Sequence, residues 1–146
     1  KVDIPACRKL FDAQWLSFVN TPLDTCGRVV LSGENLRRIL DSEDPLLRKL
    51  VECNQCFLRY QAGGREVSPP EQTTLLCDTV AVHLASSREF LKFQKLKLRV
   101  TDEGYTVEDP EHGRLVDTAV EWQDLAAFET YLTDTITNSS KRCADL

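Results

Sequence analysis

Residues 95–108 decide the fold, and they read Lys-Leu-Lys-Leu-Arg-Val-Thr-Asp-Glu-Gly-Tyr-Thr-Val-Glu. Apolar and cationic side chains alternate in the first six positions, which is the pattern of a half-buried strand. Glu103-Gly104 then predicts a two-residue hairpin turn. This turn pairs Val100 with Val107, so that like side chains share each face of the hairpin. A third strand is expected at residues 114–116, which predicts an antiparallel β-meander.

Helical periodicity dominates the first half of the chain. A helix is predicted over residues 6–19, and a short β-type run over residues 28–31 precedes a helix that Ser32 caps. Asp44-Pro45 is a stronger helix start, an N-cap acid followed by proline, and this helix should end near Tyr60. The apolar stripe that we expect to face the core from this helix consists of Leu46, Leu47, Leu50, Cys53 and Phe57.

Residues 74–85 are open to two interpretations. Val80, Val82 and Leu84 alternate with smaller or polar residues, which favours a strand. Leu75-Leu76 together with the later apolar residues would equally allow a helix. We predict a strand and keep the helix as the alternative.

The last part of the chain predicts one long amphipathic helix. Thr118 and Glu121 have the spacing of a capping box, and the helix behind them should continue to about Thr137. The fold class is therefore α+β, with a helical N-terminal half, an antiparallel β-meander and a C-terminal amphipathic helix. We expect a single domain over residues 1–146, with a loop at 61–73 between the helical and β halves.

Composition excludes several functional classes. The chain has 146 residues and a formal net charge of −5, which argues against nucleic acid as a partner. Its apolar runs are a few residues long, whereas a membrane-spanning helix needs about 20. No membrane span is therefore expected.

The cysteines lead to the first interpretation of the chain. Their even number and the absence of an initiator methionine before Lys1 fit a mature chain from an oxidising compartment. Asn138 begins a glycosylation sequence, which fits a secreted or luminal glycoprotein. The disulfide candidates are Cys7, Cys26, Cys53, Cys56, Cys77 and Cys143.

Two other interpretations of the cysteines stay open. Cys53 and Cys56 have the C-x-x-C spacing of zinc ligands, and Cys77 with His83 would complete a site. The predicted helix around Cys53 argues against the tight knuckle that zinc sites use. The other interpretation is an intracellular chain whose cysteines are free and mostly buried. We expect no cofactor and assign no metal ligand.

No catalytic constellation stands out, so we expect a protein that is not an enzyme. Cys77 and His83 could form a nucleophile–base pair, but no third group orients them. His112 lies in a turn and is expected to be solvated. Gly63-Gly64 lacks the Lys-Ser/Thr that a phosphate loop requires.

Residues 88–99 concentrate cationic side chains and interleave them with phenylalanines, which indicates a binding surface for another protein. Residues 117–134 carry acids and no Lys or Arg, so the alternative is that the basic face balances acids of its own chain. The candidate partner-binding residues, here called the basic strand surface, are Arg88, Phe90, Lys92, Phe93, Lys95, Lys97 and Arg99.

The function predicted from the sequence is a non-enzymatic recognition domain, secreted or luminal, held by disulfides and binding another protein through the basic strand surface. The first alternative is an intracellular adaptor or subunit of a larger assembly, with free cysteines and apolar helix edges docked on neighbours. The second alternative is a zinc-binding protein.

Overall fold

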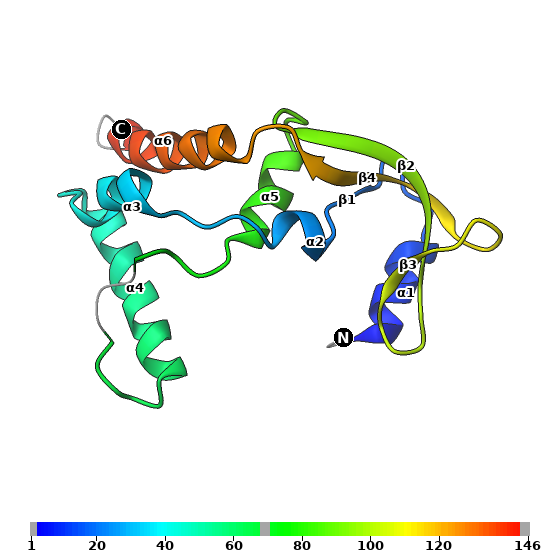
Figure 1. Ribbon diagram of the computed structural model, residues 1–146, viewed down its shortest axis with the longest axis horizontal. Helices are drawn as coiled ribbons and strands as arrows, with labels where there is room; N and C mark the ends of the chain where they lie inside the picture. The colour runs from blue at the N-terminus through cyan, green and yellow to red at the C-terminus, as the bar shows by residue number, and fades with distance from the viewer. Residues whose placement is uncertain (1–2, 68–70, 144–146) are drawn as a thin grey trace. The chain divides into compact units, whose positions relative to one another are not determined.

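The computed structural model describes residues 3–67 and 71–143, with side chains as far as Asn138 (Figure 1). The chain divides into two compact units. The first unit combines Lys1–Gly27 with Cys77–Gln123, and the second combines Arg28–Leu76 with Asp124–Leu146. Both units are thus built from segments far apart in the sequence. That they form a single domain stays a prediction.

The first unit contains a four-stranded sheet with the order β1-β4-β2-β3. β2 pairs antiparallel with β3 and with β4, whereas β1 runs parallel to β4. β4 therefore lies beside β2 rather than beside β3. The strands are β1 (Val19–Asn20), β2 (Leu91–Val100), β3 (Thr106–Glu108) and β4 (Arg114–Trp122).

Three helices belong to the first unit: α1 (Ile4–Asp12), α2 (Leu23–Cys26) and α5 (Cys77–Leu84). α1 packs on β2, where Phe11 is buried in a cluster with three apolar side chains of the sheet, Leu98, Val100 and Val116. The Phe18 ring contacts the Phe11 ring edge-on, with centroids 5.1 Å apart. These side chains exclude water from one face of the sheet.

The predicted helix over residues 6–19 is shorter in the structure and ends at Asp12. Trp15 lies beyond this end, and its indole N–H donates to the Leu10 carbonyl at 2.8 Å. That bond satisfies a carbonyl of the last helical turn, for which the helix itself supplies no N–H donor. The segment that contains Trp15 and Phe18 therefore folds back onto the helix instead of extending it.

The predicted hairpin register is wrong by one residue. Val100 pairs with Thr106, and the Thr101 N–H donates to the Tyr105 carbonyl at 2.8 Å. The loop consequently has three residues instead of two. Gly104 is the reason, because its φ of 81° is the left-handed conformation that closes a three-residue hairpin.

The strand predicted for residues 74–85 is wrong, because Cys77–Leu84 forms the helix α5. Val80 and His83 are buried while Val82 is 73% exposed, so burial repeats with the helical period and not with alternation. The apolar side chains of this segment therefore serve one helix face.

The predicted capping box at Thr118 is also wrong. β4 continues through this residue to Trp122, and α6 (Leu125–Cys143) begins later. The Asp124 carboxylate caps α6 by accepting from the Ala127 N–H at 2.9 Å. Pairing along most of β2 keeps Thr118 in the sheet, which outweighs its local preference to start a helix.

The second unit is helical and comprises α3 (Gly33–Leu40), α4 (Pro45–Gln61) and α6. Its buried side chains include Leu36, Leu47 and Phe128. Ser32 occupies the N-cap position of α3, but its side chain makes no capping hydrogen bond. As predicted, Asp44 caps α4 by accepting from the Leu46 and Leu47 N–H groups at 2.9 and 3.2 Å.

The residues predicted as a β-type run at 28–31 hydrogen-bond to a distant loop of the same unit. The Leu31 carbonyl accepts from the Thr73 N–H at 2.9 Å, and the Val29 carbonyl accepts from the Leu76 N–H at 3.0 Å.

An ion pair also joins two helices of this unit: Arg38 of α3 contacts Asp134 of α6 at 2.6 Å. The predicted α+β class is confirmed, and a C-terminal helix is present.

Candidate functional site

The basic strand surface finds its counter-charges on the neighbouring strand. Arg88 contacts Asp117 at 2.8 Å, and Lys95 approaches the same carboxylate at 3.4 Å. Lys92 contacts Glu121 at 2.8 Å. The Arg88 bond, together with Lys95, holds the pKa of Asp117 below its ordinary value, so this carboxylate stays ionised.

The other two cations of this surface are also engaged. Lys97 donates to the Pro110 carbonyl at 2.9 Å, and the Arg99 Nε donates to Asp109 at 2.5 Å. The pKa of Asp109 is lowered to about 2, chiefly because the His112 backbone N–H donates to its carboxylate. Every cation of the surface thus has an acceptor within the chain.

The two phenylalanines of the surface lie in different surroundings. The Arg88 guanidinium stacks over the Phe93 ring, 4.9 Å from its centroid. Phe90 has a φ of 70°, and its ring lies 5.8 Å from the His83 ring.

Because each cation of the basic strand surface has an acceptor within the chain, the structure favours charge balance within the chain as the role of this surface. Binding of another protein through it stays a prediction.

The predicted disulfide framework is wrong for the cysteines that the structure describes. Five of them are free thiols, and the Cys143 side chain lies outside the described residues. Burial raises the pKa of the Cys26 thiol, whose sulfur lies 3.7 Å from the Thr21 carbonyl. Without these crosslinks, a disulfide-stabilised secreted domain is no longer supported.

The glycosylation candidate Asn138 is exposed on α6, and its glycosylation stays a prediction.

The residues of the zinc alternative are divided between the units. Cys53 and Cys56 lie on α4 of the second unit, whereas Cys77 and His83 lie on α5 of the first. Within the described residues, no group of three or more His, Cys, Asp or Glu side chains could hold a metal ion. The zinc alternative therefore has no geometric support there.

Cys77 and His83 do not share a face of α5. They are six residues apart, which places them roughly 120° apart around the helix axis. The Cys77 thiol lies 3.8 Å from the Asp78 carboxylate, and the His83 Nε2 lies 3.1 Å from the Glu89 carbonyl. Each group is positioned by a different neighbour, which does not favour a nucleophile–base pair.

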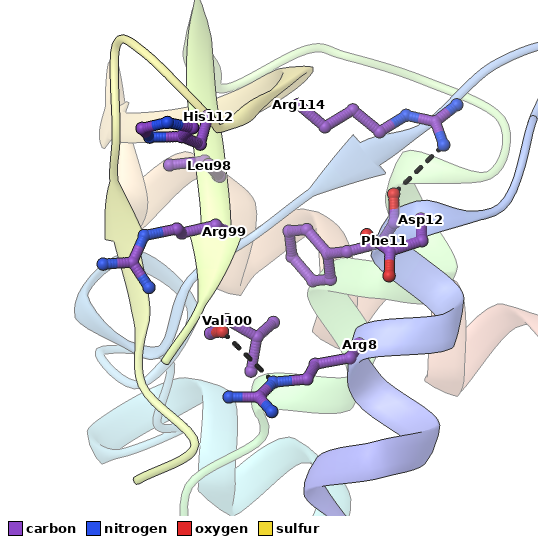
Figure 2. Close-up of a pocket in the computed structure, with 8 residues that line it drawn as sticks. All are labelled: Arg8, Phe11, Asp12, Leu98, Arg99, Val100, His112 and Arg114. Atoms are coloured by element: carbon purple, nitrogen blue, oxygen red, sulfur yellow. Dashed lines mark hydrogen bonds between the residues drawn. The ribbon is translucent and has the colours of Figure 1, made fainter. Parts of the chain in front are cut away.

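A cavity of about 280 Å³ lies between α1 and the sheet (Figure 2). Phe11, Leu98 and Val100 supply its apolar side chains. Figure 2 shows His112 and Asp12 on opposite sides of the cavity, so they form no acid–base pair.

The arginines around this cavity bind groups of their own chain instead of converging. Arg114 donates to the Phe11 carbonyl at 3.0 Å, and Arg8 donates to the Val100 carbonyl at 3.4 Å (Figure 2). Arg8 also pairs with Asp102. Arg99 points away from Phe11, as alternation along β2 requires. These arginines anchor α1 to the sheet, and the cavity is not an anion site of converging guanidinium groups.

A second cavity, of about 320 Å³, is lined by Ser17, Val19 and Thr21 before α2 and by Ala81, Leu84 and Ala85 in or after α5. No ionisable side chain lines it. It therefore offers neither proton transfer nor charge recognition.

The most exposed apolar feature of the second unit lies on α4. Although this helix has 17 residues, Leu47 is its one buried residue. Leu46 is 62% exposed, Leu50 50%, Phe57 48% and Tyr60 82%, and Cys53 between them is exposed as well. These residues define the α4 stripe: Leu46, Leu50, Cys53, Phe57 and Tyr60.

The prediction that this face of the helix packs against the core is wrong, because the residues of the α4 stripe are exposed. Leu47 and the half-buried Val51 and Leu58 turn toward the unit instead. α4 contacts α3 and α6, and Figure 1 shows its later turns extending beyond these two helices. The helix thus has two apolar faces, and the unit covers only one of them.

The sequence contained a signal for this second face. Tyr60 extends the expected core stripe by three residues. Leu46 and Leu47 together make the apolar surface of the helix wider than one neighbouring helix can cover. Periodicity predicted the amphipathic helix, but it did not show which apolar face its own unit leaves open.

None of the described helices combines the length and the apolarity needed to cross a membrane. Neither a model of a known protein family nor a curated protein matches the chain.

Proposed function

We propose that the chain is a subunit or adaptor of a larger assembly and that its docking surface is the α4 stripe. The observation that carries this proposal is the unbroken exposure of five apolar side chains along one helix face. Exposed apolar patches of this kind are costly in water and mark interaction surfaces. The free cysteines fit this function and need no crosslinked framework.

The spacing of the α4 stripe specifies a helical partner. Its members follow one another at intervals of four, three, four and three residues. This is the heptad repeat of a coiled-coil seam, in which side chains of one helix insert between those of another. A partner helix therefore needs apolar residues at the same spacing.

Charged residues contribute little to recognition by the stripe. Lys49 flanks the stripe and already pairs with Glu52 at 2.7 Å. Arg59 lies roughly 140° around the helix axis from the centre of the stripe, so it faces away from a partner that packs there. Recognition of the partner helix therefore depends on the apolar seam.

A synthetic helix tests this function directly. The probe carries leucine at the heptad positions and glutamate beside them, and its control has the same composition in scrambled order. We expect the full chain to bind the heptad peptide and not the scrambled one, as measured by fluorescence anisotropy. Leu50→Glu should weaken binding about tenfold or more, because it places a charge in the seam.

Gln55→Glu is the matched control, because it adds the same charge to α4 outside the stripe. Circular dichroism of both variants checks that the helix is intact. Equal binding of both peptides, or equal affinity of both variants, would remove the α4 stripe as a docking surface.

A further inference from the structure

We infer that the helix covering the α4 stripe is α4 of a second copy of this chain, in the antiparallel direction, with the two-fold axis near Cys53. The inference rests on the proposed function and names its partner. Three features of the helix support it: the symmetry of the stripe, the distribution of its charges and its length.

The α4 stripe is nearly symmetric about Cys53. Leu46 lies seven residues before it and Tyr60 seven residues after it, while Leu50 and Phe57 lie three before and four after. An antiparallel second copy therefore places the two leucines of one helix against the two aromatic residues of the other. Large and small side chains then face each other along the seam, which is how helices interlock.

The charges around α4 also complement their own reversed order. Asp41 lies just before the helix and Arg65 just beyond its end, twelve residues on either side of Cys53, and both are exposed. Neither forms an ion pair within the described residues. Antiparallel pairing brings the acid of one copy near Arg65 of the other, and it also aligns the helix dipoles favourably. Parallel pairing would place like charges together.

The length of the helix sets the strength of such a contact. Its 17 residues span roughly 25 Å, so the seam buries less surface than a standard protein interface. The expected dimer is therefore reversible, and it is populated at high protein concentration and lost on dilution.

Sedimentation equilibrium of the full chain under reducing conditions measures this association. We expect a monomer–dimer equilibrium whose dissociation constant rises about tenfold or more in Leu50→Glu and changes less than about threefold in Gln55→Glu. Reducing conditions ensure that any dimer is noncovalent. A chain that stays monomeric at every concentration overturns the inference, and so does a dimer that Leu50→Glu leaves intact.

Crosslinking then determines the direction of the helices. Two variants of a parent that carries Cys53→Ser and Cys56→Ser are mixed above the measured dissociation constant, one with Leu46→Cys and the other with Tyr60→Cys. A short bismaleimide should join the two variants to each other, and a mass spectrum distinguishes this product. Products that join like variants instead indicate parallel helices and overturn the inference, and the parent alone supplies the background from the other cysteines.

Failure of this inference and failure of the proposed function are separable. A monomeric chain that binds the heptad peptide, with the same sensitivity to Leu50→Glu, keeps the α4 stripe as a docking surface for a different helix. A monomer that ignores the peptide removes both.

Discussion

The guanidinium of Arg88 donates to the Asp117 carboxylate at 2.8 Å, joining the segment before β2 to β4. Lys95 lies opposite Asp117 in the strand register and approaches it at 3.4 Å. One carboxylate thus contacts two cations of a surface that, read along the chain, is strongly basic. Charge segregation in the sequence becomes charge pairing once the strands are adjacent.

The carboxylate of Asp109 should govern part of the acid sensitivity of the fold. Its pKa is lowered from 3.8 to about 2, first by the His112 N–H and further by Arg99. A carboxylate whose pKa is lowered by folding stabilises the folded state at pH values above its ordinary pKa. This stabilisation is lost as the pH falls from about 4 to about 2. Asp109→Asn should therefore be less stable near neutral pH and lose less stability over this range.

Urea unfolding at several pH values measures this effect. The variant should still lose some stability as the pH falls, because Arg8 and Arg88 lower the pKa values of Asp102 and Asp117. Asp24→Asn, on the exposed start of α2, is the control and should follow the parent profile. An Asp109→Asn profile parallel to that of the parent would contradict the prediction.

The two tryptophans should differ in their contribution to stability. Both indoles donate to a backbone carbonyl at 2.8 Å, Trp122 to Thr25 and Trp15 to Leu10, but Trp122 is 8% exposed and Trp15 50%. Trp122→Phe leaves the Thr25 carbonyl without that donor and should cost about 1–3 kcal/mol in the free energy of unfolding. Trp15→Phe should cost clearly less, because water can replace the lost donor. Denaturant unfolding of both variants compares them, and equal losses would argue against burial as the cause.

The thiols should react without prior reduction. The exposed Cys53 and Cys56 are expected to be alkylated first, and the buried Cys26 last, because burial raises the pKa of its thiol and lowers its thiolate fraction. Mass spectrometry of a timed alkylation under nonreducing conditions measures the order. Thiols that resist alkylation in denaturant until a reductant is added would restore the disulfide interpretation.

Gly113 should be intolerant of any side chain. A Cβ at this position would lie 2.5 Å from the Asp109 carbonyl oxygen and 2.6 Å from the Lys97 carbonyl carbon, both of which are backbone atoms. Gly113→Ala must therefore displace the connection between β3 and β4 and should cost about 1–3 kcal/mol. The midpoint of thermal unfolding reports this loss. An unchanged midpoint would mean that the connection moves without cost.

Local chemistry was sufficient where neighbouring residues supply the whole reason for a structure. Asp44-Pro45 starts α4 because the carboxylate accepts N–H groups two and three residues later. The alternation over residues 95–100 specifies a strand because one face of it is buried. In both cases the interactions that decide the element lie within a few residues.

Prediction failed where distant segments compete with local preference. Thr118 has the residue types of a helix start around it, but pairing of β4 with β2 keeps it in a strand. Residues 77–84 contain strand-forming valines, yet their burial is that of a helix. The hairpin differs because of one conformation, the positive φ of Gly104, which adds a residue to the loop and shifts the pairing.

The sequence by itself determined the α+β class, the extent of α4 and the helical spacing of the α4 stripe, because caps and periodicity act over short distances. The tertiary structure alone decided which charges meet and which apolar faces are covered. Asp117 neutralises Arg88 only when β4 lies beside β2, and the α4 stripe is exposed because α3 and α6 cover the adjacent face of α4, on which Leu47 lies. Burial is a property of the neighbours that a face acquires, which the residues of that face do not specify.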